Sequence, residues 1–136
     1  MQYLELMDRQ QKEYNEFPFF CAFDNKAFEE GKRKLGVTED SEIRHLFSGV
    51  FYCKKDTDAL RAMMRRFEEE KREMFKDDAF FYDAVCYELA NHEYCITYED
   101  KDTLDALGIT MEELEKDQRM GKIYCKARQD YLAETH

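Results

Sequence analysis

Apolar residues recur at helical spacing along most of the chain, and they are densest in residues 80–94. In that stretch, side chains such as Phe80 and Leu89 leave few faces of a helix polar. A helix that is apolar on most sides is normally the buried centre of a domain. The pattern therefore predicts a core helix that begins after a cap at Asp77 and ends at residues 91–93.

Amphipathic patterns predict further helices on both sides of this core helix. Pro18 ends the first, because the residue before a proline avoids the α region. Asp24 and Asn25 are good N-caps for the second and Gly36 is a good stop, and Thr110 with Glu113 has the pattern of a capping box. The helices are expected over residues 3–16, between Asp24 and Gly36, from Asp56 or Thr57 to Phe75, after Thr110, and over about 119–134. The apolar stripe of the longest one is expected to consist of Leu60, Met63, Met64, Phe67, Met74 and Phe75.

Two short segments are rich in aromatic and β-branched residues and lie between turn residues. Residues 19–23 (FFCAF) follow Pro18, and residues 50–54 (VFYCK) follow Gly49. Such runs are typical of buried strands. Because a lone ribbon is marginally stable, the two are expected to pair in antiparallel fashion with helices packed on them. The expected fold class is α+β: one compact, predominantly helical domain over residues 1–136 with a short two-stranded ribbon.

The chain is strongly acidic, with 31 acidic and 21 basic residues and a formal net charge of −10. Phosphate contacts dominate nucleic-acid affinity, so this charge argues against direct binding to DNA or RNA. It argues equally against an anionic membrane surface. It favours attraction to basic surfaces on other proteins.

The five cysteines form no CxxC pair, and their number is odd. This usage predicts free thiols in a reducing compartment rather than a disulfide framework. The first five residues show no signal-peptide pattern, and no apolar run reaches membrane-spanning length. We therefore expect a cytoplasmic protein.

The negative charge is concentrated in residues 77–117, which contain thirteen acids and two bases, whereas the remaining 95 residues carry a formal charge of +1. One interpretation is a solvated surface with several helix caps, since acidic residues favour helix starts. The other is a patch that docks a basic partner, with Tyr94 and Tyr98 supplying rigid contact area. On the second interpretation the expected partner-binding residues are Tyr98, Glu99, Asp100, Asp102, Asp105, Glu112 and Glu113.

The one cluster that resembles a catalytic or metal centre is Glu88, His92 and Glu93. Glu88 and His92 are four residues apart and would share a helix face, so they are weak candidates for metal ligands. No second histidine cluster supplies further ligands, and a Glu88–His92 hydrogen bond within the helix is the favoured interpretation. No nucleophile elbow or glycine-rich phosphate loop occurs. We expect no cofactor and no catalytic residue.

Four stretches resemble a family of small, uncharacterised acidic proteins carried by gut bacteria and by their phages and conjugative elements. These are residues 13–18 (EYNEFP), 54–59 (KKDTDA), 87–94 (YELANHEY) and 102–108 (DTLDALG). The resemblance spans most of the chain and implies no functional residues. It does imply a context, because small acidic proteins of mobile elements often block host defence nucleases, as anti-CRISPR proteins do.

The sequence therefore predicts a non-enzymatic, acidic protein-binding module. Its expected partner is a basic surface, with a nuclease complex of host defence as the specific hypothesis. Two alternatives remain open. The first is a small metal-dependent enzyme that uses Glu88, His92 and Glu93, and the second is a structural homo-oligomer.

Overall fold

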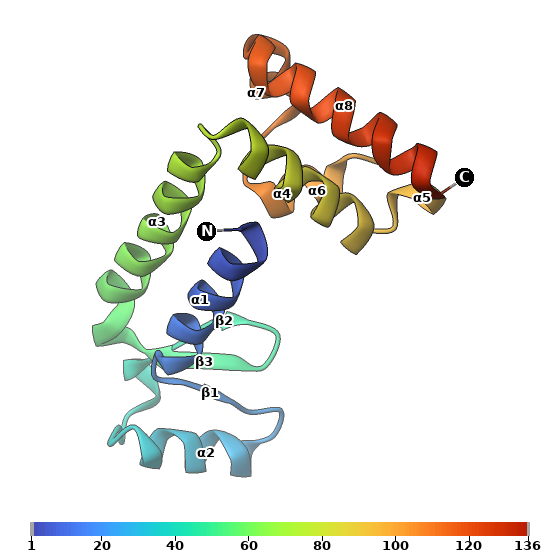
Figure 1. The fold of residues 1–136 in the computed structure, drawn as a ribbon. Helices are drawn as coiled ribbons and strands as arrows, with labels where there is room; N and C mark the ends of the chain where they lie inside the picture. The colour runs from blue at the N-terminus through green and yellow to red at the C-terminus, as the bar shows by residue number, and fades with distance from the viewer. Residues whose placement is uncertain (1, 136) are drawn as a thin grey trace. The chain divides into compact units, whose positions relative to one another are not determined.

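The computed structural model describes residues 2–135, which form eight α-helices and one small sheet (Figure 1). The chain divides into two compact units. The helical unit consists of Met1–Met7 and Glu68–His136, and the sheet unit is Asp8–Phe67. Helices α1 (Tyr3–Glu16) and α3 (Thr57–Met74) each contribute residues to both units. That residues 1–136 form one domain stays a prediction.

The sheet unit contains three antiparallel strands in the order β1-β3-β2. Strands β1 (Phe19–Cys21) and β3 (Val50–Cys53) pair as predicted, with Phe20 opposite Phe51. The prediction of a two-stranded ribbon is wrong, because β2 (Ile43–Phe47) adds a third strand on the other side of β3. Most of β2 is exposed on both faces, so its sequence lacks the apolar alternation that identifies a half-buried strand.

One face of the sheet is covered by α2 (Asn25–Lys34), as Figure 1 shows. The rings of Phe20, Phe28 and Phe51 form an aromatic cluster between this helix and the strands. Gly31 lies directly against Phe20, since a Cβ at this position would approach the Phe20 ring to 2.1 Å. Of the two predicted caps, Asp24 is confirmed, because it accepts a hydrogen bond from the Ala27 N–H at 2.7 Å, whereas Asn25 is the first residue of the helix.

The other face of the sheet packs on the parts of α1 and α3 that belong to this unit. Tyr52 of β3 contacts Leu60, Met63 and Phe67 of α3 in one buried cluster. Rings of Tyr14, Phe17 and Phe19 extend the cluster towards α1. The exception in the predicted stripe of α3 is Met64, which is exposed.

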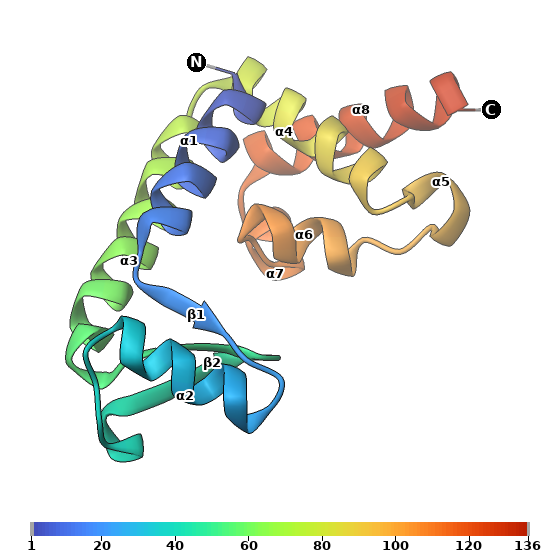
Figure 2. The same ribbon diagram turned by 90° about the horizontal axis from the view of Figure 1, so that it is seen from below.

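The helical unit is built around α4 (Asp78–Asn91), which lies beside α8 (Gln118–Thr135) in both ribbon views (Figures 1 and 2). The predicted core helix is confirmed, because Phe81, Val85 and Leu89 of α4 are fully buried. Asp77 caps it by accepting a hydrogen bond from the Phe80 N–H at 2.9 Å. The short helices α5 (Tyr94–Thr97), α6 (Lys101–Leu107) and α7 (Met111–Lys116) connect α4 to α8.

The predicted capping box at Thr110 forms only in part. The Thr110 hydroxyl accepts the N–H of Glu113 at 3.1 Å, as expected. The Glu113 carboxylate pairs with Arg72 of α3 rather than reaching back to Thr110. All five cysteines are free thiols, as predicted. None of the helices within residues 2–135 combines the length and the apolar character that crossing a bilayer requires.

Candidate functional site

The acidic segment, residues 77–117, lies wholly within the helical unit and gives that unit its charge. The helical unit contains twenty acidic and nine basic residues, a formal charge of −11. The sheet unit contains eleven acidic and twelve basic residues, a formal charge of +1. The charge asymmetry in the sequence therefore coincides with the division of the fold.

Asp100 is a structural residue of the helical unit. Its carboxylate accepts a hydrogen bond from the Tyr124 hydroxyl at 2.7 Å and pairs with Arg128 at 3.4 Å, both on α8. Its side chain is 20% exposed. Burial, followed by the hydrogen bond to Asp100, raises the pKa of Tyr124. Asp100 therefore holds the start of α6 against α8 and offers little to a partner.

Three more of the predicted contact residues are paired within the helical unit. Asp105 pairs with Lys101 at 3.2 Å along α6, and Glu112 pairs with Lys116 at 3.1 Å along α7. Glu113 pairs with Arg72 at 3.4 Å, and the Arg72 guanidinium also donates to the Gly108 carbonyl at 2.8 Å. These carboxylates are partly neutralised, so they add less to an acidic docking surface than the sequence suggested.

The remaining predicted residues lie close together along the chain, around α5. Glu99 and Asp102 are exposed and make no ion pair within the part of the chain that is described. Glu93 is exposed as well. Between these acids, Ile96 is 72% exposed and Tyr98 is 56% exposed. Residues 93–102 therefore combine acidic groups with two large apolar side chains that face solvent.

The backbone of this segment is conformationally unusual. Figure 2 shows α5 as a single turn set between two loops. Glu93 before it and Tyr98 after it both adopt left-handed backbone conformations, with φ of 53° and 55°. This region costs an L-residue roughly 1–2 kcal/mol, and such outliers cluster at binding and switch regions. The two residues are the N-cap and the C-cap that bound α5.

Tyr94, the first residue of α5, is buried. The expectation that it contributes contact area for a partner is therefore not met. Its side chain is buried, and its ring lies 6.5 Å from Tyr131 and 5.9 Å from Tyr98, measured between ring centroids. The exposed Tyr98 ring packs edge-on against the buried Tyr94 ring. A rigid aromatic residue of this kind contributes contact area at low entropic cost.

Glu88, His92 and Glu93 are not brought together as a metal site. Glu88 is 3% exposed, and its carboxylate accepts the Tyr3 hydroxyl at 2.9 Å, so the expected Glu88–His92 side-chain bond is replaced by a bond to α1. Helix α4 ends at Asn91 with His92 as its C-cap, which places Glu93 beyond the helix. No group of three or more potential metal ligands occurs among residues 2–135.

The sequence did not indicate that Ile96 is exposed or that Glu93 bounds α5. Ile96 lies beyond residues 91–93, where the core helix is predicted to end, and no predicted element contains it. The left-handed residues that limit α5 are glutamate and tyrosine, whereas glycine and asparagine are the residues that normally announce this conformation. The unusual backbone was therefore invisible in the sequence.

Comparison with known proteins identifies a family and gives no function. No curated protein and no solved structure matches the chain. That gut bacteria or their phages carry this protein stays a prediction. The family of unknown function DUF7659 matches residues 2–130. Because that match covers nearly the whole chain, the protein belongs to this family.

Proposed function

We propose that this protein is a non-enzymatic binding module that docks a basic surface of another protein, with residues 93–102 at the centre of the contact. The observation that carries the proposal is the composition of this segment. Glu99 and Asp102 are exposed and unpaired among the described residues, and they flank the exposed side chains of Ile96 and Tyr98.

The arrangement matches the general anatomy of a protein–protein interface. Binding energy is concentrated in a few apolar or aromatic residues that become fully desolvated. Surrounding charges add specificity and speed the encounter when the partner has the opposite sign. Ile96 and Tyr98 would serve as the anchors, and Glu93, Glu99 and Asp102 as the charged rim.

The charge of the helical unit narrows the class of partner. A unit with a formal charge of −11 attracts basic surfaces over distances of about a Debye length, roughly 8–10 Å in ordinary buffers. Proteins that handle nucleic acids carry such surfaces, because they neutralise phosphates with lysine and arginine. We therefore propose a nucleic-acid-handling complex as the partner, with a host defence nuclease inhibited by a mobile-element protein as the specific case.

The test is a pull-down of partners from a host lysate at low and at high salt, with three forms of the full chain. The first is the native protein, and the second carries Glu99→Lys and Asp102→Lys. The third carries Glu69→Lys and Glu115→Lys, which changes the net charge of the helical unit by the same amount at exposed positions outside residues 93–102. We expect a basic protein to be retained at low salt by the native and third forms and to be lost from the second.

The proposal fails if the second and third forms lose the partner equally, because binding would then follow net charge rather than this segment. It also fails if retention is indifferent to salt. Circular dichroism of all three forms establishes that the substitutions leave the helices intact, which is expected for exposed positions.

A further inference from the structure

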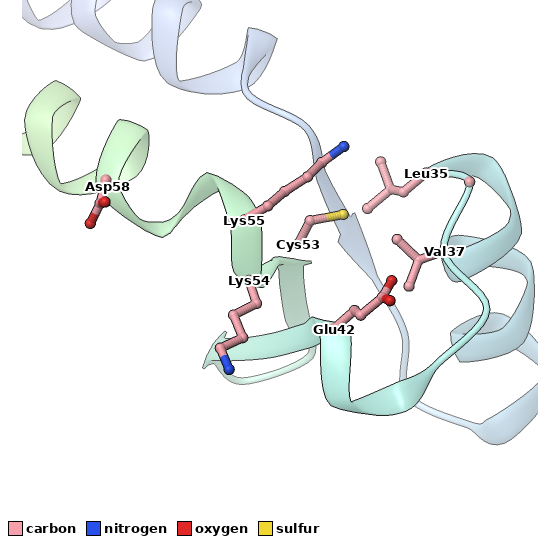
Figure 3. A pocket seen from close by; sticks show the side chains of 8 residues that line it. Leu35, Val37, Glu42, Cys53, Lys54, Lys55 and Asp58 are labelled. Atoms are coloured by element: carbon pink, nitrogen blue, oxygen red, sulfur yellow. The ribbon is translucent and has the colours of Figure 1, made fainter.

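The sheet unit contains a cavity of about 630 Å³ that is distinct from the acidic segment (Figure 3). It is bounded by the loop after α2, the end of β3, and the two short 3₁₀ turns Asp40–Glu42 and Lys54–Asp56. Sites for small molecules usually have volumes of about 300–1,000 Å³ and combine apolar walls with a few polar groups. This cavity has both properties.

The apolar part of the cavity is formed by Leu35, Val37 and Cys53, whose side chains point towards one another in Figure 3. Cys53 is 3% exposed, and its thiol makes no hydrogen bond to any residue within 2–135. The space beside Gly36, between Leu35 and Val37, is empty, since a Cβ at that position would meet no atom within 4 Å. The buried Cys53 thiol therefore adds to the apolar wall of this space.

Two opposite charges flank the thiol. Figure 3 shows the Glu42 carboxylate near Val37 and Lys55 extending past Cys53 on the other side. Neither charged group forms an ion pair, with the other or elsewhere, in the described part of the chain. Burial is the main cause that raises the pKa of the Cys53 thiol, and among the smaller effects Asp56 and Glu42 raise it and Lys55 lowers it. Both charges therefore act on the same small volume.

We propose that this cavity binds a small zwitterion with an apolar body, of the class of aliphatic amino acids. The ammonium group of the ligand would pair with Glu42 and its carboxylate with Lys55. Its aliphatic part would pack on Leu35, Val37 and Cys53. A ligand with one charge leaves the opposite protein charge unmatched, so electrostatic complementarity selects the zwitterion.

The thiol is a contact group in this site and not a nucleophile. Nucleophilic cysteines have a lowered pKa and partial exposure, whereas a cysteine that is buried in apolar surroundings is chemically inert. Cys53 belongs to the second kind, because it is buried and the pKa of its thiol is raised. The proposed role of the cavity is therefore reversible binding.

The experiment uses the full chain with labelled leucine and valine methyl groups, observed by NMR. The probes are norleucine, hexanoate and hexylamine, which share an aliphatic body and differ in charge. Ligands of this size bind in the millimolar range when they use only a few contacts. We expect norleucine to shift the methyl signals of Leu35 and Val37 in a saturable way, and the two singly charged probes to bind at least tenfold more weakly.

Neighbouring residues supply matched control variants. Lys54 and Asp58 also border the cavity, but their side chains point away from the other labelled groups in Figure 3. Lys55→Met and Glu42→Gln should each weaken norleucine binding about tenfold, the loss expected for one charged contact. Lys54→Met and Asp58→Asn should leave it unchanged. All four positions are exposed, so the fold should tolerate these substitutions.

Three results would overturn the proposal. The first is the absence of saturable shifts at Leu35 and Val37 with norleucine. The second is equal affinity for hexanoate or hexylamine, which would show that the ligand does not need both charges. The third is an equal effect of Lys54→Met and Lys55→Met. None of these outcomes bears on the acidic segment.

Discussion

The Tyr3 hydroxyl donates a hydrogen bond to Oε2 of Glu88 at 2.9 Å, although 85 residues separate the two along the chain. Both residues are almost completely buried. A buried carboxylate is tolerated only when its oxygens have hydrogen-bond partners. The bond thus ties the start of α1 to α4 and explains how an acidic residue can occupy the core helix.

Removing the Tyr3 hydroxyl should destabilise the fold. Tyr3→Phe leaves a buried carboxylate oxygen without its donor, which costs about 1–3 kcal/mol. Tyr87→Phe is the matched control, because the Tyr87 side chain is exposed and its hydroxyl should contribute less than about 0.5 kcal/mol. Chemical denaturation of both variants gives the two free energies of unfolding, and equal values would contradict the role of the bond.

Stability should fall as the solution becomes alkaline. Burial and the Glu88 carboxylate raise the pKa of Tyr3, and a hydrogen bond to Asp130 raises that of Tyr82. Each tyrosine binds its proton more tightly in the folded state than in the unfolded state. The associated stability is therefore complete below the ordinary tyrosine pKa of about 10 and is lost as the pH rises above it.

The measurement is the free energy of unfolding as a function of pH from neutral to strongly alkaline conditions, with tyrosinate absorbance followed in parallel. In the Tyr3→Phe variant the decline above about pH 10 should be shallower than in the native chain. An identical decline in both would show that Tyr3 does not titrate with folding.

Asp100 and its neighbour Glu99 should separate stability from binding. Asp100→Asn weakens charge-assisted bonds to Tyr124 and Arg128, so we expect a loss of about 1–3 kcal/mol. Glu99→Gln should change stability by less than about 0.5 kcal/mol, because the side chain is exposed. In the pull-down the order should reverse, with Glu99→Gln giving the larger loss of partner. Thermal denaturation and the pull-down are both needed to check this.

Glycine should stabilise the chain at Glu93 and destabilise it at Glu99. Glu93 has a φ of 53°, so Glu93→Gly relieves the left-handed strain and should stabilise the fold by up to about 1 kcal/mol. Glu99 has no positive φ, so Glu99→Gly only adds entropy to the unfolded chain and should cost about 0.5–1 kcal/mol. Equal signs in chemical denaturation would contradict the conformation described for α5.

Gly31 should tolerate a larger residue only when Phe20 becomes smaller. A Cβ at Gly31 would approach the Phe20 ring to 2.1 Å, and overpacking of this kind costs about 1–3 kcal/mol. In a Phe20→Ala background the same Gly31→Ala change should be neutral or stabilising, because alanine is the better helix former. A double-mutant cycle of unfolding free energies measures the coupling, and additive effects would refute the contact.

The sequence by itself determined the features that depend on neighbours along the chain. Asp24 and Asp77 each cap a helix by bonding an N–H three residues later, so both caps are readable from local spacing. The apolar residues of α4 likewise predict a core helix, and Phe81, Val85 and Leu89 are fully buried. The concentration of acids in residues 77–117 is likewise a property of the sequence.

Only the tertiary structure decided which of those acids are available to a partner. Asp100 is held by Tyr124 and Arg128, and Glu113 by Arg72, through contacts between residues that are 24 to 41 positions apart. Strand β2 likewise exists because β3 supplies its backbone hydrogen bonds, since its own pattern does not predict a strand. The same physical reason explains the pairing of the acids and the formation of β2. A cap is completed within one helical turn, whereas an ion pair or a sheet edge requires that distant segments have already packed together.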